Sequence, residues 1–274
     1  MKILPFIKMS GTGNDFIIMD AVKGMNLKQL AARVCDRTKG IGADGLLILD
    51  KSTKADYKML IINADGSEAE MCGNGARCMI AYIALHKKIK KKFMTLETLA
   101  GLIRGEVKGN VVSIRLSDPV DYQPDIPLKV KERSIHVSYI DTGVPHTIVY
   151  VDDLNRINVQ QIGQAIRCHE RFQPRGTNVN FVEQVDTKLI NVRTYERGVE
   201  DETKACGTGS VASAIITYLK ANPAVDTKER AKMKVHTNGQ DLLEVTFDIT
   251  EKKVSNVWLK GNVLLIAEGE YYLS

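Results

Sequence analysis

Long apolar segments are scarce in this sequence of 274 residues. No run approaches the roughly 20 apolar residues that a helix needs to cross a bilayer. The apolar stretch at residues 1–7 is too short for a secretion signal, and no small-residue cleavage site follows it. We therefore expect a cytoplasmic protein with no membrane partner.

Cysteine and histidine are also scarce, with five residues of each. The cysteines are odd in number and lack the spacing of a disulfide framework, which suits a reducing cytoplasm. The chain has no Cys-x-x-Cys pair, and no histidine lies near either of the cysteine turns described below, so we expect no metal site. Cys35, Cys78 and Cys168 lie in helical patterns and are expected to be small buried residues.

Neither sign of charge dominates, because the formal net charge is only +5. The densest basic run, residues 87–92, is typical of a solvated helix end, where cations suit the C-terminal dipole. We expect no nucleic-acid partner.

Three glycines, Gly40, Gly42 and Gly45, match the spacing of a dinucleotide-binding fingerprint. That fingerprint needs a strand, a turn and then a helix, whereas these glycines follow a helical pattern and precede a strand. A helix end and a tight turn explain them better.

A cysteine directly before a glycine-rich turn occurs twice. The two copies read Met71-Cys72-Gly73-Asn74-Gly75-Ala76-Arg77 and Ala205-Cys206-Gly207-Thr208-Gly209-Ser210. After each copy, apolar residues recur at helical spacing. Cys72 and Cys206 should therefore lie at helix N-termini, where unpaired N–H groups and the helix dipole lower the pKa of a thiol and can also hold a carboxylate.

Other landmarks repeat at nearly constant spacing. Thr142 follows Thr12 by 130 residues, Cys168 follows Cys35 by 133, Gly176 follows Gly42 by 134, and Cys206 follows Cys72 by 134. Such a series indicates a tandem duplication into two similar domains. We place them at residues 1–118, completed by 264–274, and at residues 119–263, with a linker at the proline cluster Pro119, Pro124 and Pro127.

Strands outnumber helices in both halves. In the first half we predict strands at residues 3–8, 16–20, 46–50, 57–63, 93–97, 102–107 and 111–116, and helices at residues 27–38 and after Cys72. Most neighbouring strands resemble hairpins. The predicted fold is α+β: two similar domains, each a mainly antiparallel sheet or barrel wrapped around one central helix.

Two activated thiols on either side of one anion site would suit stereoinversion without a cofactor. One thiolate removes a proton from the carbon beside a carboxylate, and the opposite thiol delivers one to the other face. Helix-end N–H groups would stabilise the charge that develops. Two alternatives remain, a dithiol–disulfide redox couple and a protein that binds an amino acid without chemistry. Redox pairs are usually close in sequence, and a pure binder needs no matched thiols.

Five blocks of the sequence resemble the diaminopimelate epimerase family. They are residues 11–16 (GTGNDF), 71–78 (MCGNGARC), 176–181 (GTNVNF), 195–198 (YERG) and 205–209 (ACGTG), in the family's order. The resemblance implies an isomerase of lysine and peptidoglycan precursor biosynthesis that interconverts LL- and meso-diaminopimelate without pyridoxal phosphate. It also implies a homodimer.

The same resemblance implies roles for individual residues. Cys72 and Cys206 would be the acid–base pair, and His146 and Glu196 would tune the thiols. The implied substrate-binding residues are Asn14, Asn63, Gly73, Asn74, Asn178, Glu196, Arg197, Gly207 and Thr208. The glycine-turn N–H groups would hold the reacting carboxylate, and the Arg197 fork would hold the distal one. Asn63, Asn178 and Glu196 would hold the distal ammonium.

Two positions depart from the family pattern. Gly45 stands where many members have a glutamine that contacts the substrate, and Val144 stands where many have an asparagine before Pro-His. Both changes remove side-chain hydrogen bonds near the ligand. A racemase of another amino acid, such as proline or histidine, therefore stays open as the alternative.

Overall fold

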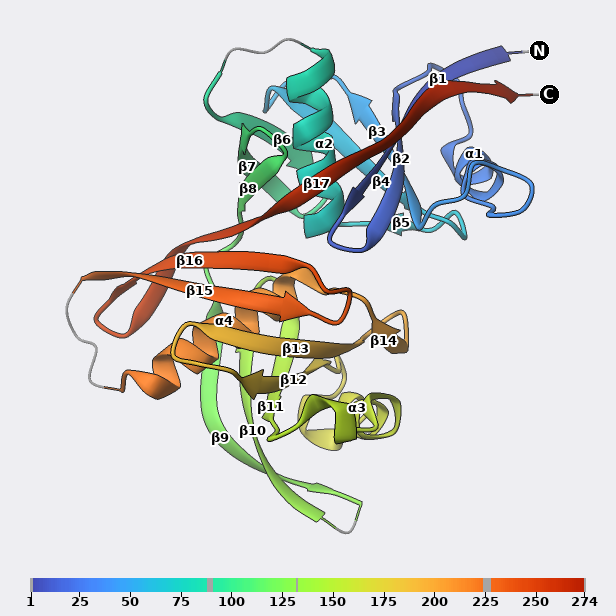
Figure 1. Cartoon of the computed structure of the whole chain (residues 1–274). Helices are drawn as coiled ribbons and strands as arrows, with labels where there is room; N and C mark the ends of the chain where they lie inside the picture. The colour runs from blue at the N-terminus through green and yellow to red at the C-terminus, as the bar shows by residue number, and fades with distance from the viewer. Residues whose placement is uncertain (1, 88–90, 132, 224–227, 274) are drawn as a thin grey trace. The chain divides into compact units, whose positions relative to one another are not determined.

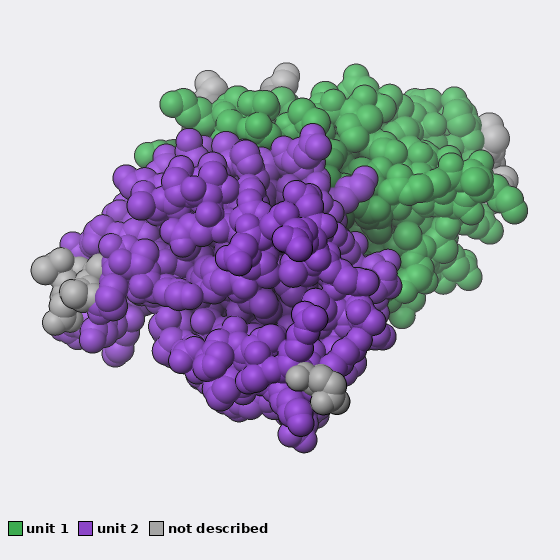
Figure 2. All heavy atoms as spheres, turned by 60° about the horizontal axis from the view of Figure 1, so that its bottom comes forward, with its two compact units in different colours: residues 1–114, 261–274 green, residues 115–260 purple. Residues whose placement is uncertain are grey.

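The structure is a computed structural model that describes residues 2–87, 91–131, 133–223 and 228–273. It divides into two units, which Figure 2 shows in separate colours. Unit 1 comprises residues 1–114 and 261–274, and unit 2 comprises residues 115–260. Each unit is described by itself below.

Unit 1 contains the first eight strands, two helices and the end of the last strand. Its elements are β1 (Lys2–Gly11), β2 (Asn14–Asp20), α1 (Leu27–Val34), β3 (Gly45–Asp50), β4 (Tyr57–Asn63), β5 (Glu68–Ala69), α2 (Gly73–His86), β6 (Met94–Thr98), β7 (Gly101–Lys108), β8 (Val111–Arg115) and the C-terminal part of β17 (Lys253–Leu273). The basic run predicted at a helix end follows α2, and its residues 88–90 lie outside the described part of the chain.

Unit 2 repeats this order of elements (Figure 1). Its elements are β9 (Val120–Val130), β10 (Arg133–Asp141), β11 (Pro145–Tyr150), η1 (Leu154–Arg156), α3 (Val159–Arg167), η2 (Glu170–Phe172), β12 (Asn178–Gln184), β13 (Leu189–Glu196), β14 (Asp201–Thr203), α4 (Gly207–Ala221), β15 (Glu229–Thr237), β16 (Leu242–Thr250) and the first part of β17. From β10 onward, every strand and α-helix of unit 2 has a counterpart in the same order in unit 1. The predicted duplication and α+β class are confirmed.

Most strand pairs are antiparallel, as expected from the hairpin patterns. The parallel pairs are β2–β3 and β4–β6 in unit 1, and β11–β12 and β13–β15 in unit 2. A helix lies between the strands of each parallel pair in the sequence, because parallel neighbours need a crossover connection.

The two longest helices form the centres of their units. In α2 every residue from Asn74 to Ile83 is buried, and in α4 every residue from Gly209 to Thr217 is buried. A helix that is apolar on all sides has to be enclosed. Helix α2 contacts β1, β2, β3, β4 and β7, and α4 contacts β10–β13, β15 and β16.

The last strand completes the sheet of unit 1. β17 pairs with β1 from Lys2–Leu273 to Gly11–Val263 and also pairs with β8. The pairings β1–β2–β3–β4–β6–β7–β8–β17 thus return to β1 and close the sheet around α2. Closure leaves these strands without a free edge.

The prediction of a linker at residues 119–127 was wrong. From Val120 onward this segment belongs to β9, which pairs with β10, and Pro127 stands in register with His136. Proline lacks an N–H donor, but a strand tolerates it where the missing N–H would point away from the partner strand. The proline cluster therefore did not exclude a strand.

Two other predictions need correction. The helix predicted at residues 27–38 ends at Val34, whose carbonyl accepts the N–H groups of Ile41 and Gly42, both at 2.9 Å. Gly42 has a φ of 80°, so the glycine pattern is a helix end and a turn, as expected. Cys168 is exposed rather than buried, because it caps the C-terminus of α3 outside the apolar stripe. Cys35 and Cys78 are buried as expected.

Among the described residues, no helix is long and apolar enough to cross a membrane. No group of three or more His, Cys, Asp or Glu side chains in the described part of the chain could hold a metal ion.

Candidate active site

The residues singled out from the sequence lie in two groups, one in each unit, which are described separately. The first half-site, in unit 1, contains Cys72, the first turn of α2, Asn14 and Asn63. The second half-site, in unit 2, contains Cys206, the first turn of α4, His146, Asn178, Glu196 and Arg197.

Cys72 is the N-cap of α2, with extended backbone angles of φ −141° and ψ 116°. Its Sγ accepts a hydrogen bond from the N–H of Gly75 at 3.5 Å. The N–H groups of the first helical turn have no preceding helical acceptor and carry the positive end of the dipole. The predicted position of Cys72 at a helix N-terminus is confirmed.

Asn14 and Asn74 lie in contact beside Cys72. The Asn74 amide donates to Oδ1 of Asn14 at 2.5 Å, and the Asn14 amide donates to Asp44 at 3.0 Å. The buried Arg77 guanidinium contacts Thr12 and donates to Oδ1 of Asn74 at 2.9 Å. Arg77 was not singled out from the sequence. The sequence feature that could have identified it is a cationic residue within an otherwise apolar helix.

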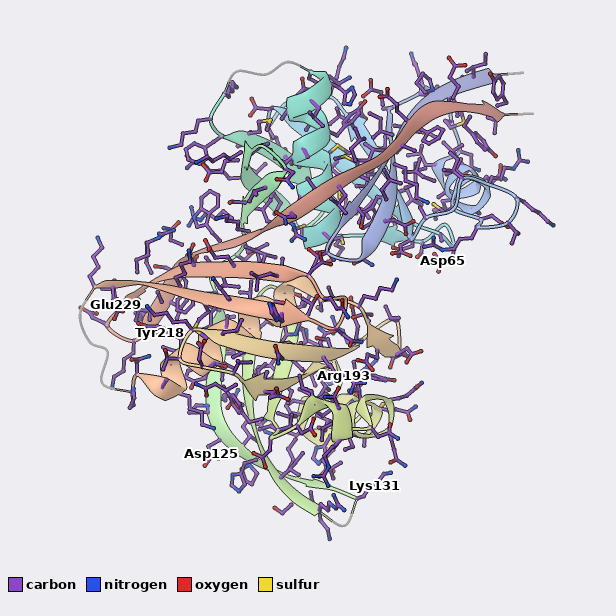
Figure 3. All side chains as sticks on the ribbon, viewed as in Figure 1. Asp65, Asp125, Lys131, Arg193, Tyr218 and Glu229 are labelled. Atoms are coloured by element: carbon purple, nitrogen blue, oxygen red, sulfur yellow. The ribbon has the colours of Figure 1, made fainter. Side chains whose placement is uncertain are left out.

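Asn63 lies at the end of β4, directly opposite Gly45 of β3. Its side chain is exposed and donates to the Ser67 hydroxyl at 3.0 Å, and that hydroxyl donates in turn to Asp65, labelled in Figure 3, at 2.6 Å. A Cβ at Gly45 would lie 3.1 Å from the Ile62 carbonyl oxygen. A side chain at this position would therefore require the neighbouring strand to move by a few tenths of an ångström.

Cys206 is the N-cap of α4, with φ −117° and ψ 113°, and its side chain is buried. Its Sγ lies 3.5 Å from the Thr208 hydroxyl. Its carbonyl accepts both the N–H and the hydroxyl of Ser210 at 2.9 Å. The Thr142 hydroxyl donates to the Thr208 carbonyl at 3.3 Å and so ties the turn before β11 to this helix end.

Asn178 and Arg197 are joined directly in the second half-site. The Asn178 Oδ1 accepts the Arg197 backbone N–H at 2.9 Å, and its Nδ2 donates to the Pro145 carbonyl at 3.0 Å. The Arg197 guanidinium donates to the Arg175 carbonyl at 2.7 Å. Asn178 thus holds the backbone that carries Arg197, an arrangement that the sequence did not reveal.

The neighbouring carboxyl group of Glu196 lies at the end of β13. Burial raises its pKa above the ordinary value for glutamate, and the nearby Thr203 hydroxyl partly opposes this rise. The loop that follows is fastened by Arg193, labelled in Figure 3, which pairs with Glu202 of β14 at 2.7 Å. After this loop the chain returns as β14, in which Asp201 stands in register with Glu196.

His146 is fully buried on β11, in parallel register with Asn178. Burial, with a smaller contribution from the Arg197 charge, lowers its pKa to about 3. The imidazole is therefore neutral at physiological pH. Its Nδ1 lies 3.1 Å from the amide nitrogen of Asn180, a residue that the sequence analysis did not single out.

This burial predicts a specific effect of acid on stability. Below pH 6.5, the ordinary pKa of histidine, this side chain is protonated in the unfolded chain. In the folded protein it stays neutral down to about pH 3, so the free energy of unfolding decreases as the pH is lowered over this range. One such group changes the free energy of unfolding by about 1.4 kcal/mol per pH unit. His146→Phe, which installs the residue found at the matching position Phe16, should flatten the acid side of the stability curve by that amount. Urea unfolding from pH 7 to pH 4 measures it.

His236→Gln is the matched control, because His236 is exposed on β15. Its curve should follow that of the unchanged protein. Parallel curves for His146→Phe and the unchanged protein would contradict the buried neutral imidazole.

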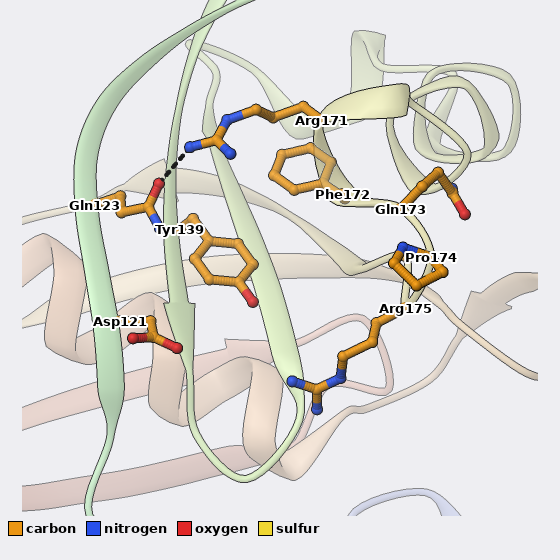
Figure 4. Close-up of a pocket in the computed structure, with 9 residues that line it drawn as sticks. Asp121, Gln123, Tyr139, Arg171, Phe172, Gln173, Pro174 and Arg175 are labelled. Carbon is orange, nitrogen blue, oxygen red and sulfur yellow. Dashed lines mark hydrogen bonds between the residues drawn. The ribbon is translucent and has the colours of Figure 1, made fainter.

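Unit 2 also contains a pocket of about 220 Å³ between η2 and the strands β9 and β10 (Figure 4). Arg171 lies on one wall and donates to Gln123 at 2.6 Å, and Tyr139 stacks on Phe172. None of the predicted site residues lines this pocket. Its Arg175 side chain pairs with Asp141 at 3.0 Å.

Known proteins resemble this chain over most of its length. The sequence profile of the diaminopimelate epimerase family matches residues 6–117 and 138–264. A diaminopimelate epimerase of Aquifex aeolicus is 39% identical over 97% of each chain, and one of Methanothrix thermoacetophila is 42% identical over 79% of this chain and 81% of its own.

Solved structures share the fold at low identity. A PhzF-family phenazine biosynthesis protein of Bacillus anthracis has a TM-score of 0.77 at 17% identity and covers all of both chains. A hydroxyproline epimerase of Agrobacterium vitis has a TM-score of 0.68 at 14% identity, covering 98% of this chain and 92% of its own. The full-length sequence matches, together with a cysteine at the N-cap of each central helix, show that this chain belongs to the diaminopimelate epimerase family.

Proposed function

We propose that this epimerase interconverts LL- and meso-diaminopimelate by a two-base mechanism in which Cys72 and Cys206 are the acid and the base. The observation that carries the proposal is the repeated geometry. Each unit supplies a cysteine as the N-cap of its buried central helix. The reaction needs one proton removed from the α-carbon and one delivered to its opposite face, and each thiol serves one of these steps.

The main chemical difficulty of this reaction is the weak acidity of an amino acid α-carbon. The helix ends would lower this barrier. The first-turn N–H groups of Gly73, Asn74, Gly207 and Thr208 would bind the reacting carboxylate and stabilise the enediolate-like charge as the proton leaves. Such donors are already oriented before the reaction, so they need no rearrangement in the transition state. The reaction then requires no pyridoxal phosphate.

Residues of both half-sites support a substrate with charged groups at both ends. Arg197 carries a planar guanidinium that suits a second carboxylate. Glu196, Asn178 and Asn63 offer oxygen acceptors for a second ammonium. We propose that the product serves the biosynthesis of lysine and peptidoglycan precursors in the cytoplasm. A racemase of a smaller amino acid would have less use for Arg197.

Solvent exchange tests this function. In deuterated water, purified reduced protein with no added pyridoxal phosphate should incorporate deuterium at the α-carbon of LL-diaminopimelate and form the meso isomer. Proline, histidine, hydroxyproline, lysine and glutamate serve as the comparison panel. Exchange of proline or histidine in preference to diaminopimelate would support the alternative racemase, and exchange of none would refute both.

We also propose that the chain acts as a homodimer, as its resemblance to the family implies. Unit 1 has exposed apolar side chains on β1 and β17, namely Ile3, Leu264, Leu265, Ile266 and Tyr272. Exposed apolar side chains that gather on one surface mark interaction sites, and we propose that these residues form such a surface. Sedimentation should give twice the chain mass, and Leu264→Asp should shift it toward the monomer. A monomeric unchanged protein would refute the proposal.

A further inference from the structure

The side chains that pack against the first turn of the central helix differ between the two units, although the units repeat the same fold. Against the first turn of α2, the Leu47 side chain lies 3.2 Å from the position of a Cβ at Gly75. Against the first turn of α4, Oδ1 of Asn180 lies 2.2 Å from the position of a Cβ at Gly209. Leu47 pairs across the sheet with Ile61, and Asn180 pairs in the same way with Thr194. Unit 2 thus has a polar pair where unit 1 is apolar.

The orientation of the buried Asn180 amide follows from its partners. Its Nδ2 lies 3.3 Å from the Thr147 carbonyl, which can only accept, so the nitrogen must face this group. The same Nδ2 lies 3.1 Å from Nδ1 of His146. On the other side, Oδ1 accepts the Thr194 hydroxyl at 2.9 Å. A reversed amide would bring two acceptors together at Thr147.

The orientation of the amide decides the tautomer of the imidazole. Because Nδ2 can only donate, Nδ1 of His146 must accept, and a neutral ring then carries its proton on Nε2. Nε2 is buried and has no hydrogen-bond partner among the described residues. A buried donor without a partner is costly and is uncommon in folded proteins.

We propose that Asn180 is a positioning residue, which holds His146 in its Nε2–H tautomer and so keeps one N–H donor ready in the second half-site. The inference deepens the proposed function and rests on it. Folding alone does not require the polar group, because unit 1 encloses its central helix with leucine at the matching position. Burying an amide gains little stability even when it is fully hydrogen-bonded. A role in setting the proton position gives a reason for it.

Nitrogen NMR on protein labelled with ¹⁵N-histidine tests the tautomer directly. The signal that is lost in His146→Phe identifies His146 among the five histidines. The unchanged protein should show a proton on Nε2 and none on Nδ1. Asn180→Asp replaces a donor by an acceptor of the same shape and should move the proton to Nδ1. Asn180→Leu, which installs the residue that unit 1 has at Leu47, should leave the ring in a mixture of tautomers.

The kinetic arm uses α-hydrogen exchange on diaminopimelate. Both Asn180 variants should lower kcat by about 10- to 100-fold, the loss typical when a partner that orients a metal-binding histidine is removed. KM should stay unchanged, since Asn180 is fully buried and is not among the proposed substrate-binding residues. Ser213→Ala is the control: it deletes a buried hydroxyl of α4 that has no hydrogen-bond partner among the described residues. Its tautomer and rate should match those of the unchanged protein.

Each outcome decides between a positioning role and a merely structural role for Asn180. A Nδ1–H tautomer in the unchanged protein overturns the proposal, and so does a rate loss in Asn180→Leu without any change of tautomer. A tautomer change without a rate loss also overturns it. If the spectra agree but the unchanged protein epimerises no amino acid, the proposed function fails and the tautomer assignment stands.

Discussion

Replacing either Cys72 or Cys206 by alanine should abolish epimerisation, with a loss of about 10²- to 10⁴-fold for the removal of one positioned acid or base. Each cysteine is the N-cap of a central helix, and alanine leaves the helix-end N–H groups in place but removes the group that carries the proton. Chiral chromatography of the meso isomer formed from LL-diaminopimelate measures the rate of epimerisation. Any remaining deuterium exchange should occur from one stereoisomer only, because one thiol reaches one face.

Cys168→Ala is the matched control, since Cys168 is exposed at the end of α3. The buried thiols make a second comparison: burial raises the pKa of both Cys35 and Cys78 to about 12, so neither ionises near neutral pH. A Cys72→Ala or Cys206→Ala variant with near-normal turnover would exclude the two-base mechanism.

Arg197→Leu should lower kcat/KM for diaminopimelate by about 100-fold, which corresponds to two hydrogen bonds to a charged group at about 1.5 kcal/mol each. The guanidinium donates to the Arg175 carbonyl, and its backbone is held by Asn178, so its direction is set before the substrate arrives. Arg197→Lys should recover only part of the loss, because an ammonium cannot form the planar two-point contact. Initial rates over a range of substrate concentrations separate the effects on kcat and KM.

Arg171→Leu removes an exposed arginine of the same unit and serves as the control for the loss of positive charge. It should leave kcat/KM unchanged. If Arg197→Leu keeps full activity on diaminopimelate, the distal carboxylate is bound elsewhere. Retained activity on a monocarboxylic amino acid would point to the alternative racemase.

Patterns local in sequence were predictable. The strand predicted at residues 57–63 is β4 at those bounds, and the helices after Cys72 and Cys206 begin at Gly73 and Gly207. The apolar periodicity of a segment indicates which of its faces is buried, so it predicts the type of element without tertiary information. The same reasoning placed the end of α1 four residues too late, because the N–H groups of Ile41 and Gly42 in the following turn donate to the carbonyl of Val34.

Such patterns could not predict contacts between segments that are distant in the sequence. Nothing local marks residues 120–127 as part of a strand, since β9 is a strand only through its pairing with β10. Asn180 differs from its neighbour Asn178 only in its position along β12 and in what packs there. The Asn180–His146 contact joins residues 34 apart, which a periodic pattern cannot report.

The sequence by itself determined the duplication, the α+β class and the position of each cysteine before a helix, because repeats, periodicity and glycine turns are properties of short stretches. Tertiary structure alone decided which polar groups lie behind the helix ends. Strand pairing puts Asn180, Thr194 and His146 together in unit 2 and leaves Leu47 and Ile61 in unit 1. The physical reason is that hydrogen-bond partners, burial and the resulting proton positions depend on neighbours in space rather than neighbours along the chain.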